Sequence, residues 1–141
     1  MSGDHDPVYT YLISRGCAPL VVRRGLDGLL EQWSAIVQAA ERGRDESLDE
    51  WLNDMDLRDI LAGALAAAAP RDRRAAAGRL DDSDERFLAI TTPSACLWGE
   101  DVARTNRWHA EWQWWYFRRP TALGPILRED LLVHGFLRAE L

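Results

Sequence analysis

The sequence predicts a single, mostly α-helical domain, and two observations support this fold class. Ala and Leu contribute 38 residues, whereas the β-branched residues Val, Ile and Thr contribute 16 of 141. Ala and Leu lose little side-chain entropy in helices, while sheets are usually rich in β-branched residues. Apolar residues also recur at helical spacing along much of the chain. We therefore expect one domain over residues 1–141, a bundle of five to seven helices with a small β element near residues 95–117.

The first clear helix follows a less regular N-terminal stretch. Residues 1–7 are expected to form a frayed tail, and residues 9–13 fit either a helical turn or a short strand. From Leu26 onward one helical face is apolar, and Gly43 stands where a C-terminal cap belongs. This face consists of Leu26, Leu29, Leu30, Trp33, Ile36, Val37 and Ala40.

A second helix is predicted to begin at Ser47, because Glu50 follows at the spacing of a capping box. Its apolar stripe consists of Leu48, Trp51, Leu52 and Met55. A third helix is predicted from a further stripe, and Pro70 ends it because the residue before a proline avoids helical geometry. The members of this stripe are Leu57, Ile60, Leu61, Ala64, Leu65 and Ala68.

The two stripes are out of phase, which predicts a break between these helices. Continuing the first stripe would require apolar side chains where Arg58 and Asp59 stand. We therefore place a break at Asp54–Asp56, with Asp54 or Asp56 capping the third helix. Residues 53–56 also resemble the start of a calcium loop, but its glycine and its final glutamate are missing, so capping is the better interpretation.

Two shorter helices are predicted after Pro70. Residues 71–78 are rich in Arg and Ala, a composition typical of a short helix with a solvated face. Asp81, Asp82 and Ser83 are candidate N-caps for a helix that runs to Ile90. Residues 91–94 are expected to form a loop, and residues 95–98 a short strand.

The last part of the chain contains an aromatic segment and a final helix. Residues 108–117 fit helical and strand spacing alike, and we predict a helix because the surroundings are helical. A turn at Gly124 and Pro125 precedes a last helix, which Gly135 ends.

Charge and hydropathy exclude two classes of protein. The net charge of −6 lies within residues 1–60, and Asp45–Asp59 alone carries seven acids against one Arg. A general nucleic-acid binder needs a basic surface that displaces counterions, so we expect no nucleic-acid partner. No apolar run is long enough to span a bilayer, so we expect no membrane partner.

Residue usage also indicates a source and a compartment. All 17 basic residues are Arg, which together with 19 Ala indicates a GC-rich bacterial genome. No signal-like apolar stretch follows the N-terminus, and Cys17 and Cys96 are too few for a disulfide framework. We expect a cytoplasmic protein with reduced cysteines.

Motifs that would carry catalysis are incomplete. His109 and Glu111 match the first half of the zinc deaminase pattern, but the second half, Pro-Cys-x-x-Cys, is missing. None of the three histidines has a histidine four residues away, which is the spacing of a helical metal site. We therefore expect no catalytic residues, no metal and no cofactor.

The segment from Arg104 to Arg119 combines four Arg with six aromatic residues and one acid. Trp residues can form the core of a small domain, with Arg stems covering them. They can also anchor a protein interface, which favours Trp, Tyr and Arg, or stack on bases. We favour the core, keep the interface as an alternative, and disfavour nucleic acid because the rest of the chain is acidic.

The acidic stretch has two interpretations, a solvated helix face or a docking surface for a basic protein. The function we expect is a non-catalytic protein-binding module, and one version of it is an immunity- or antitoxin-like inhibitor. The candidate partner-binding residues are Asp49, Glu50, Asp59, Trp112, Trp115, Tyr116, Arg118 and Arg119.

An alternative function is a small-molecule-binding protein or an enzyme with a Trp- and Arg-lined pocket. In that case Trp112, Trp115 and Tyr116 would form the walls, and Arg118 or Arg119 would meet an anionic group. The sequence predicts neither the identity of the partner nor the oligomeric state.

Overall fold

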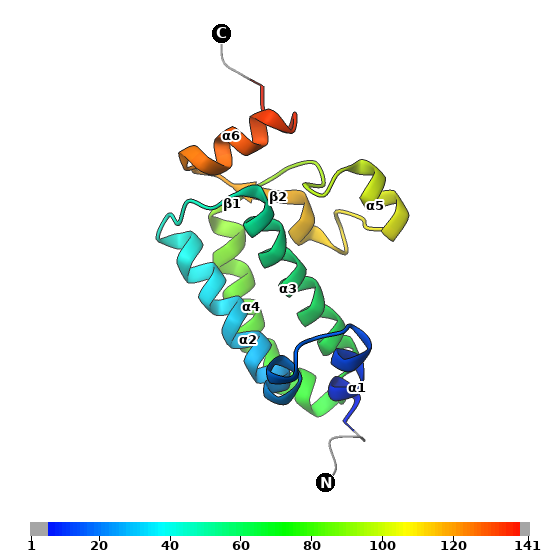
Figure 1. Ribbon diagram of the computed structural model, residues 1–141. Helices are drawn as coiled ribbons and strands as arrows, with labels where there is room; N and C mark the ends of the chain where they lie inside the picture. Colours follow the sequence, from blue (N-terminus) through cyan, green and yellow to red (C-terminus); the bar gives the residue numbers. More distant parts are fainter. Residues whose placement is uncertain (1–5, 139–141) are drawn as a thin grey trace.

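Three long helices form the body of the fold, namely α2 (Pro19–Glu41), α3 (Leu48–Ala67) and α4 (Pro70–Ala89) (Figure 1). The computed structural model describes residues 6–138 and confirms a mostly α-helical domain with a small antiparallel sheet. In chain order the elements within that range are α1 (Pro7–Ser14), α2 (Pro19–Glu41), α3 (Leu48–Ala67), α4 (Pro70–Ala89), β1 (Thr91–Pro93), α5 (Glu100–Asn106), the 3-10 helix η2 (Trp114–Phe117), β2 (Arg118–Pro120) and α6 (Pro125–Val133).

The remaining elements lie at the two ends of this bundle. α1 packs against α2 and α3 at one end, while the sheet, α5, η2 and α6 gather toward the other (Figure 1). The core runs between them, and its fully buried side chains include Leu12, Trp33, Met55, Leu61 and Phe87. No helix within residues 6–138 is long and apolar enough to cross a membrane.

The helix ends follow local signals. Asp6 caps α1 by accepting a hydrogen bond from the Val8 amide at 2.9 Å, so Asp6 and Pro7 belong to a helix start rather than to a frayed tail. The rest of that predicted tail, residues 1–5, lies outside the described residues. Residues 9–13 are helical. The predicted caps at Gly43 and Gly135 are confirmed by positive φ angles of 80° and 79°.

The capping box at the start of α3 is confirmed. The Ser47 hydroxyl accepts a hydrogen bond from the Glu50 amide at 3.2 Å, and the Glu50 carboxylate accepts one from the Ser47 amide at 3.2 Å. α2 begins at Pro19, which occupies the first helical position, but the backbone of Gly25 is not helical (φ 58°, ψ −145°), so α2 consists of two helical stretches that meet at a kink. The second stretch begins at Leu26, as predicted, whereas the first one, before Gly25, was not predicted.

The predicted break at Asp54–Asp56 is wrong, because α3 continues without interruption from Leu48 to Ala67. Each of its buried residues lies three or four residues from another one, so they form one stripe, and Arg58 belongs to it. Arg58 is only 5% exposed. The phase shift arose because an arginine was assigned to solvent, whereas this arginine faces the core. The stripe consists of Leu48, Trp51, Leu52, Met55, Arg58, Leu61, Ala64 and Leu65.

The two helices predicted after Pro70 are in fact one, α4. Asp81 and Asp82 are exposed on its surface and Ser83 is buried within it, so none of them is an N-cap. Pro70 separates α3 from α4 as predicted. Arg73 supports this corner, because its guanidinium donates hydrogen bonds to the carbonyl oxygens of Leu65, Ala66 and Ala68, the last carbonyls of α3.

The β element flanks the aromatic segment rather than lying within it. β1 pairs antiparallel with β2, with Thr92 opposite Arg119. The predicted strand at residues 95–98 is wrong, because these residues form a bend and a turn. The predicted helix at 108–117 is also wrong: turns lead into η2, and α5 precedes them without having been predicted. Crowded aromatics carried no usable period, so local pattern could not settle this region.

Helix caps link α6 to the start of α3, although the residues involved are more than eighty positions apart in the sequence. The Asp45 carboxylate accepts hydrogen bonds from the backbone amides of Ile126 at 2.9 Å and Leu127 at 3.2 Å. In return, the Asp130 carboxylate accepts one from the Leu48 amide at 2.8 Å. The first amides of α6 therefore find their acceptor in the connection that precedes α3, and the first amide of α3 finds its acceptor on α6, which fixes α6 against the start of α3.

Gly124 makes this exchange possible, and the contact can be tested. A Cβ at Gly124 would meet the Asp45 carboxyl group. We expect Asp45→Ala to lower the free energy of unfolding by about 0.5–2 kcal/mol, the usual loss for a helix cap. Gly124→Ala should also destabilise, because it displaces the same carboxylate. Chemical denaturation followed by circular dichroism measures both losses.

The double variant distinguishes a shared contact from two separate ones. Since both substitutions remove the same cap, the loss in the double variant should be well below the sum of the single losses. Asp81→Ala, at an exposed position of α4, is the control and should change stability little. Fully additive losses at Asp45 and Gly124 would contradict the capping role.

Candidate functional site

Arg58 is the most buried charge of the described chain, and it lies at the centre of the aromatic cluster. Its guanidinium binds Asp84 of α4 through two hydrogen bonds, Nε to Oδ1 at 3.1 Å and Nη2 to Oδ2 at 2.8 Å. The guanidinium carbon also lies 4.7 Å from the ring centroid of Trp115 and 5.3 Å from that of Trp114. Trp33 donates its indole N–H to the same Asp84 at 2.9 Å. The buried charge is therefore paired and covered by aromatic faces.

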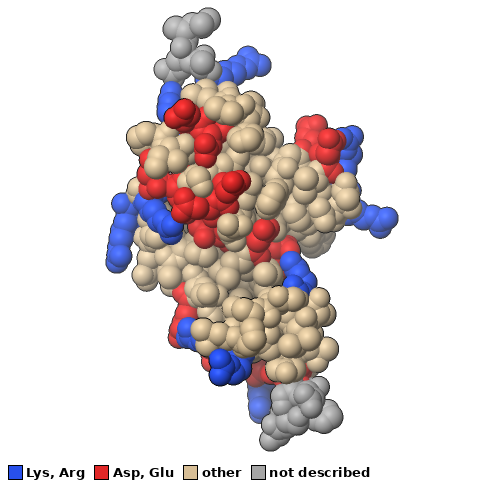
Figure 2. Space-filling view, in the orientation of Figure 1, with Lys and Arg blue, Asp and Glu red and all other residues tan. Residues whose placement is uncertain are grey.

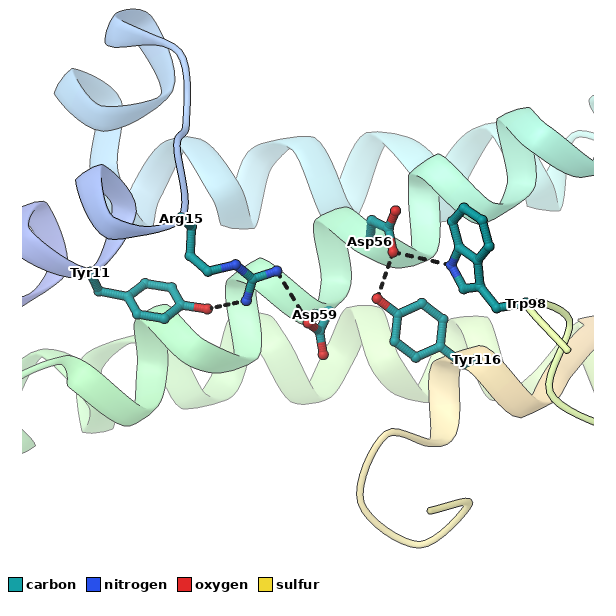
Figure 3. A network of polar contacts seen from close by, with 6 residues as sticks. All are labelled: Tyr11, Arg15, Asp56, Asp59, Trp98 and Tyr116. Atoms are coloured by element: carbon teal, nitrogen blue, oxygen red, sulfur yellow. Dashed lines mark hydrogen bonds and ion pairs between the residues drawn. The ribbon is translucent and has the colours of Figure 1, made fainter. Parts of the chain in front are cut away.

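Asp56 joins the middle of α3 to the aromatic segment (Figure 3). One carboxylate oxygen accepts hydrogen bonds from the Tyr116 hydroxyl at 2.6 Å and from the Trp98 indole at 3.3 Å. Burial and this hydrogen bond raise the pKa of Tyr116 well above its usual range, so its hydroxyl remains a donor. Asp56, predicted as a possible helix cap, is instead a tether for η2 and the loop before α5.

Asp59 makes the corresponding contact with α1 (Figure 3). Its carboxylate lies 3.4 Å from Arg15 Nη2, and Arg15 Nη1 donates to the Tyr11 hydroxyl at 2.8 Å. Burial raises the pKa of Asp59. This predicted partner-binding residue is half-buried and already paired within the fold, so it does not present a free charge to a partner.

The predicted aromatic and arginine site residues separate into buried and exposed groups. Trp115 and Tyr116 are 4% and 1% exposed, so they form core and are not accessible to a partner. Arg118 is held inside the fold by hydrogen bonds to the Thr91 hydroxyl at 2.7 Å and to its carbonyl oxygen at 2.8 Å. Trp112 is 69% exposed on a turn, and Arg119 lies half-buried on β2. Trp115 and Tyr116 are therefore core residues. Of the predicted aromatic and arginine residues, only Trp112 and Arg119 remain accessible to a partner.

The acids at the start of α3 differ in how firmly they are held. Glu50 completes the capping box and also lies 3.0 Å from Arg44 Nη2, and these contacts lower its pKa. Asp49 is exposed on the first turn, and its side chain makes no hydrogen bond or ion pair with any other residue in the 6–138 range. Among the three acids predicted to bind a partner, Glu50 and Asp59 make polar contacts within the described part of the fold, whereas the Asp49 side chain makes none.

Glu46 is an acid that sequence reasoning did not single out. It is 6% exposed, and its Oε2 has no hydrogen-bond partner among the described residues. The nearest cation is Arg44, whose Nη2 lies 3.7 Å from that oxygen. Burial and the neighbouring Asp54 carboxyl group raise the pKa of Glu46 to about 8. A buried acid beside a second acid holds its proton, so Glu46 is largely neutral near pH 7.

Acidic side chains gather on one face of the molecule, over the N-terminal half of α3 and the adjoining α6 (Figure 2). The hydrogen bonds between these two helices place their acids next to one another. We call this surface the acidic face, and it comprises Asp45, Asp49, Glu50, Asp54 and Asp130.

The residues predicted to line a Trp- and Arg-lined pocket do not line the cleft that opens beside α5. Trp112 and the buried pair Trp115 and Tyr116 do not form its walls. This cleft has a volume of about 520 Å³. Its basic residues are Arg104, Arg107 and His109, and its apolar residues include Cys96, Trp108 and Phe117. Glu111 is exposed and does not line this cleft, so the His109–Glu111 pair does not converge there.

Comparison with protein-family models, with curated proteins and with solved structures finds no match for this chain. Within residues 6–138, no three His, Cys, Asp or Glu side chains are placed to hold a metal ion together. The acidic face and the cleft beside α5 are two surfaces of the described residues on which a ligand or partner could bind.

The raised pKa of Glu46 predicts a specific dependence of stability on pH. An unfolded glutamate releases its proton near pH 4.5, whereas folded Glu46 keeps it to about pH 8. The folded state binds more protons in this interval, so stability should fall as the pH rises through it. We expect Glu46→Gln, which is neutral at all pH values, to flatten this fall and to exceed the wild type in thermal midpoint at about pH 8.5.

Thermal unfolding at several pH values between about 5.5 and 8.5 measures this effect. Asp49→Asn removes one charge from an exposed site and should leave the slope of the wild type unchanged. If the Glu46→Gln variant retains that slope, Glu46 does not hold its proton in the folded chain.

Proposed function

We propose that this chain is a non-catalytic protein-binding module whose acidic face docks a basic protein. The observation that carries the proposal is the convergence of acids from the α2–α3 connection, α3 and α6 on one face. The hydrogen bonds that these acids make within the fold do not use all of their acceptor positions. An ionised carboxylate has about four acceptor positions, and each capping acid here uses one or two of them. The outward positions remain open to the N–H groups of a partner's Arg and Lys side chains.

The distribution of charge supports the same partner class. Residues 1–60 carry the whole net charge of −6, and residues 61–141 are neutral in sum. Two of the arginines in the first part, Arg15 and Arg58, form ion pairs with Asp59 and Asp84 of the same chain. Such asymmetry attracts a basic protein and speeds its association, while it repels the phosphates of nucleic acids.

The specific version we propose is an immunity- or antitoxin-like inhibitor that covers the basic surface of a partner, such as a nuclease. The proposed setting is the cytoplasm of a bacterium, as the arginine-only basic residues and the two free thiols suggest. Burial raises the pKa of the Cys96 thiol, which favours the unreactive protonated form.

The test reverses the charge at one position of α3 and adds a positive charge at a second, and neither residue performs capping. Asp49 and Asn53 lie four residues apart on the exposed side of the helix. We expect Asp49→Arg/Asn53→Arg to slow the association of a basic partner about tenfold at low salt. The difference should shrink at high salt, because exposed charges are screened beyond about 8 Å at physiological ionic strength. The partner is captured from native lysate of the source organism, and association rates are then measured with the purified pair.

A matched variant controls for total charge. Asp81→Arg/Glu85→Gln changes the net charge by the same amount at two exposed positions of α4, four residues apart. Its association rate should remain close to that of the wild type. Retention of no basic protein, or equal rates for both variants, would reject docking on the acidic face.

A further inference from the structure

The cleft beside α5 has the size and lining of a small-molecule site. Its volume of about 520 Å³ lies within the range of about 300–1,000 Å³ that such sites occupy. Cys96 and Ala103 form apolar, buried parts of the lining. Trp108 is held in place because one face of its ring stacks on Tyr116, with the centroids 4.0 Å apart and the planes 16° apart. Trp108 and Phe117 are both half-buried, and they give the lining of the cleft its aromatic surface.

The rim of the cleft is basic. Arg104, Arg107 and His109 line it, against the single acid Glu100. Arg104 is paired with Asp101. Arg107 is exposed and makes no ion pair within the described part of the chain. A guanidinium with free N–H groups beside aromatic surface is suited to a carboxylate attached to a flat apolar body.

The backbone at Arg107 provides an independent indication that its side chain is functional. Arg107 has φ 57° and ψ 39°, and it is the one residue other than glycine with a positive φ in the range 6–138. It ends α5, where the Trp108 amide donates to the Ala103 carbonyl oxygen at 2.9 Å. After α1, α2 and α6, the residue with positive φ is a glycine in each case, namely Gly16, Gly43 and Gly135.

Glycine adopts this left-handed conformation without the steric penalty that a side chain incurs. Four helix ends contain a residue with a positive φ. This residue is a glycine at three of them and an arginine at the end of α5, and this arginine lines the cleft. A residue held in such a conformation at the edge of a cleft indicates that its side chain performs a task there.

We propose that the cleft beside α5 binds a small aromatic carboxylate, whose ring packs on Trp108 and Phe117 and whose carboxylate pairs with Arg107. This site is separate from the acidic face, so its test does not depend on a protein partner.

The experiment uses 2-naphthoate as the probe, with isothermal titration calorimetry and tryptophan fluorescence as readouts. We expect saturable binding of one naphthoate per chain. 2-Naphthamide has the same ring without the charge, and acetate has the charge without the ring. Both should bind at least about tenfold more weakly than 2-naphthoate, because each lacks one of the two contacts.

Arg107→Gly separates a binding role from a structural one. Glycine relieves the backbone conformation, so the thermal midpoint should rise by about 2–4 °C while the affinity for naphthoate falls about tenfold. Arg107→Gln should lose the same affinity without the gain in midpoint. Arg74→Gln, at an exposed position of α4, removes one arginine elsewhere and should change neither quantity.

Several results would overturn the proposal. These are the absence of saturable naphthoate binding, equal affinities for naphthoate and naphthamide, and an unchanged affinity in Arg107→Gly. Binding of a peptide that ends in a C-terminal phenylalanine, without binding of free naphthoate, would also overturn it and would assign the cleft to a protein terminus.

Discussion

The ion pair between Arg58 and Asp84 is the interaction on which the arrangement of the helices depends. A guanidinium in an apolar stripe is tolerated only where a carboxylate and aromatic faces replace the water it has lost. Asp84 supplies the carboxylate from α4, and Trp33, Trp114 and Trp115 supply the faces from α2 and η2. One side chain of α3 therefore sets the positions of two helices and of the aromatic segment.

Local signals predicted much of the fold, and long-range contacts explain what they missed. The helical class, the capping box at Ser47 and the glycines after α2 and α6 depend on neighbours in sequence, so a pattern can reveal them. The continuity of α3 was missed because Arg58 looked like a solvent residue inside an apolar series. The exchange of caps between Asp45 and Asp130 joins positions more than eighty residues apart, which no local spacing shows. The cleft was missed because the aromatic segment has no dominant period, and α5 is a short helix of seven residues with one buried side chain, too few for an apolar stripe.

The acids of α3 show why a charge run is difficult to interpret from sequence. Asp45 and Glu50 act as caps, Asp56 and Asp59 as tethers, and Glu46 as a buried, protonated acid. Most acids between Asp45 and Asp59 therefore have a structural role. The lone pairs of the capping carboxylates that face solvent, together with the Asp49 side chain, remain available to a partner. The basic cleft beside α5 is a different surface with the opposite charge. The chain thus separates a candidate protein-docking face from a candidate small-anion site, and each can be altered without the other.

A double-mutant cycle between Arg58 and Asp84 tests the central role of the ion pair most directly. Arg58→Met alone leaves a largely buried carboxylate unpaired and should lower the free energy of unfolding by about 3–5 kcal/mol, and Asp84→Asn alone should also be strongly destabilising. Either change breaks the same ion pair. The loss of unfolding free energy in the double variant should therefore be smaller than the sum of the two single losses by about 2 kcal/mol or more. Losses that add to within about 0.5 kcal/mol would contradict this account and assign the organisation of the bundle to apolar packing alone.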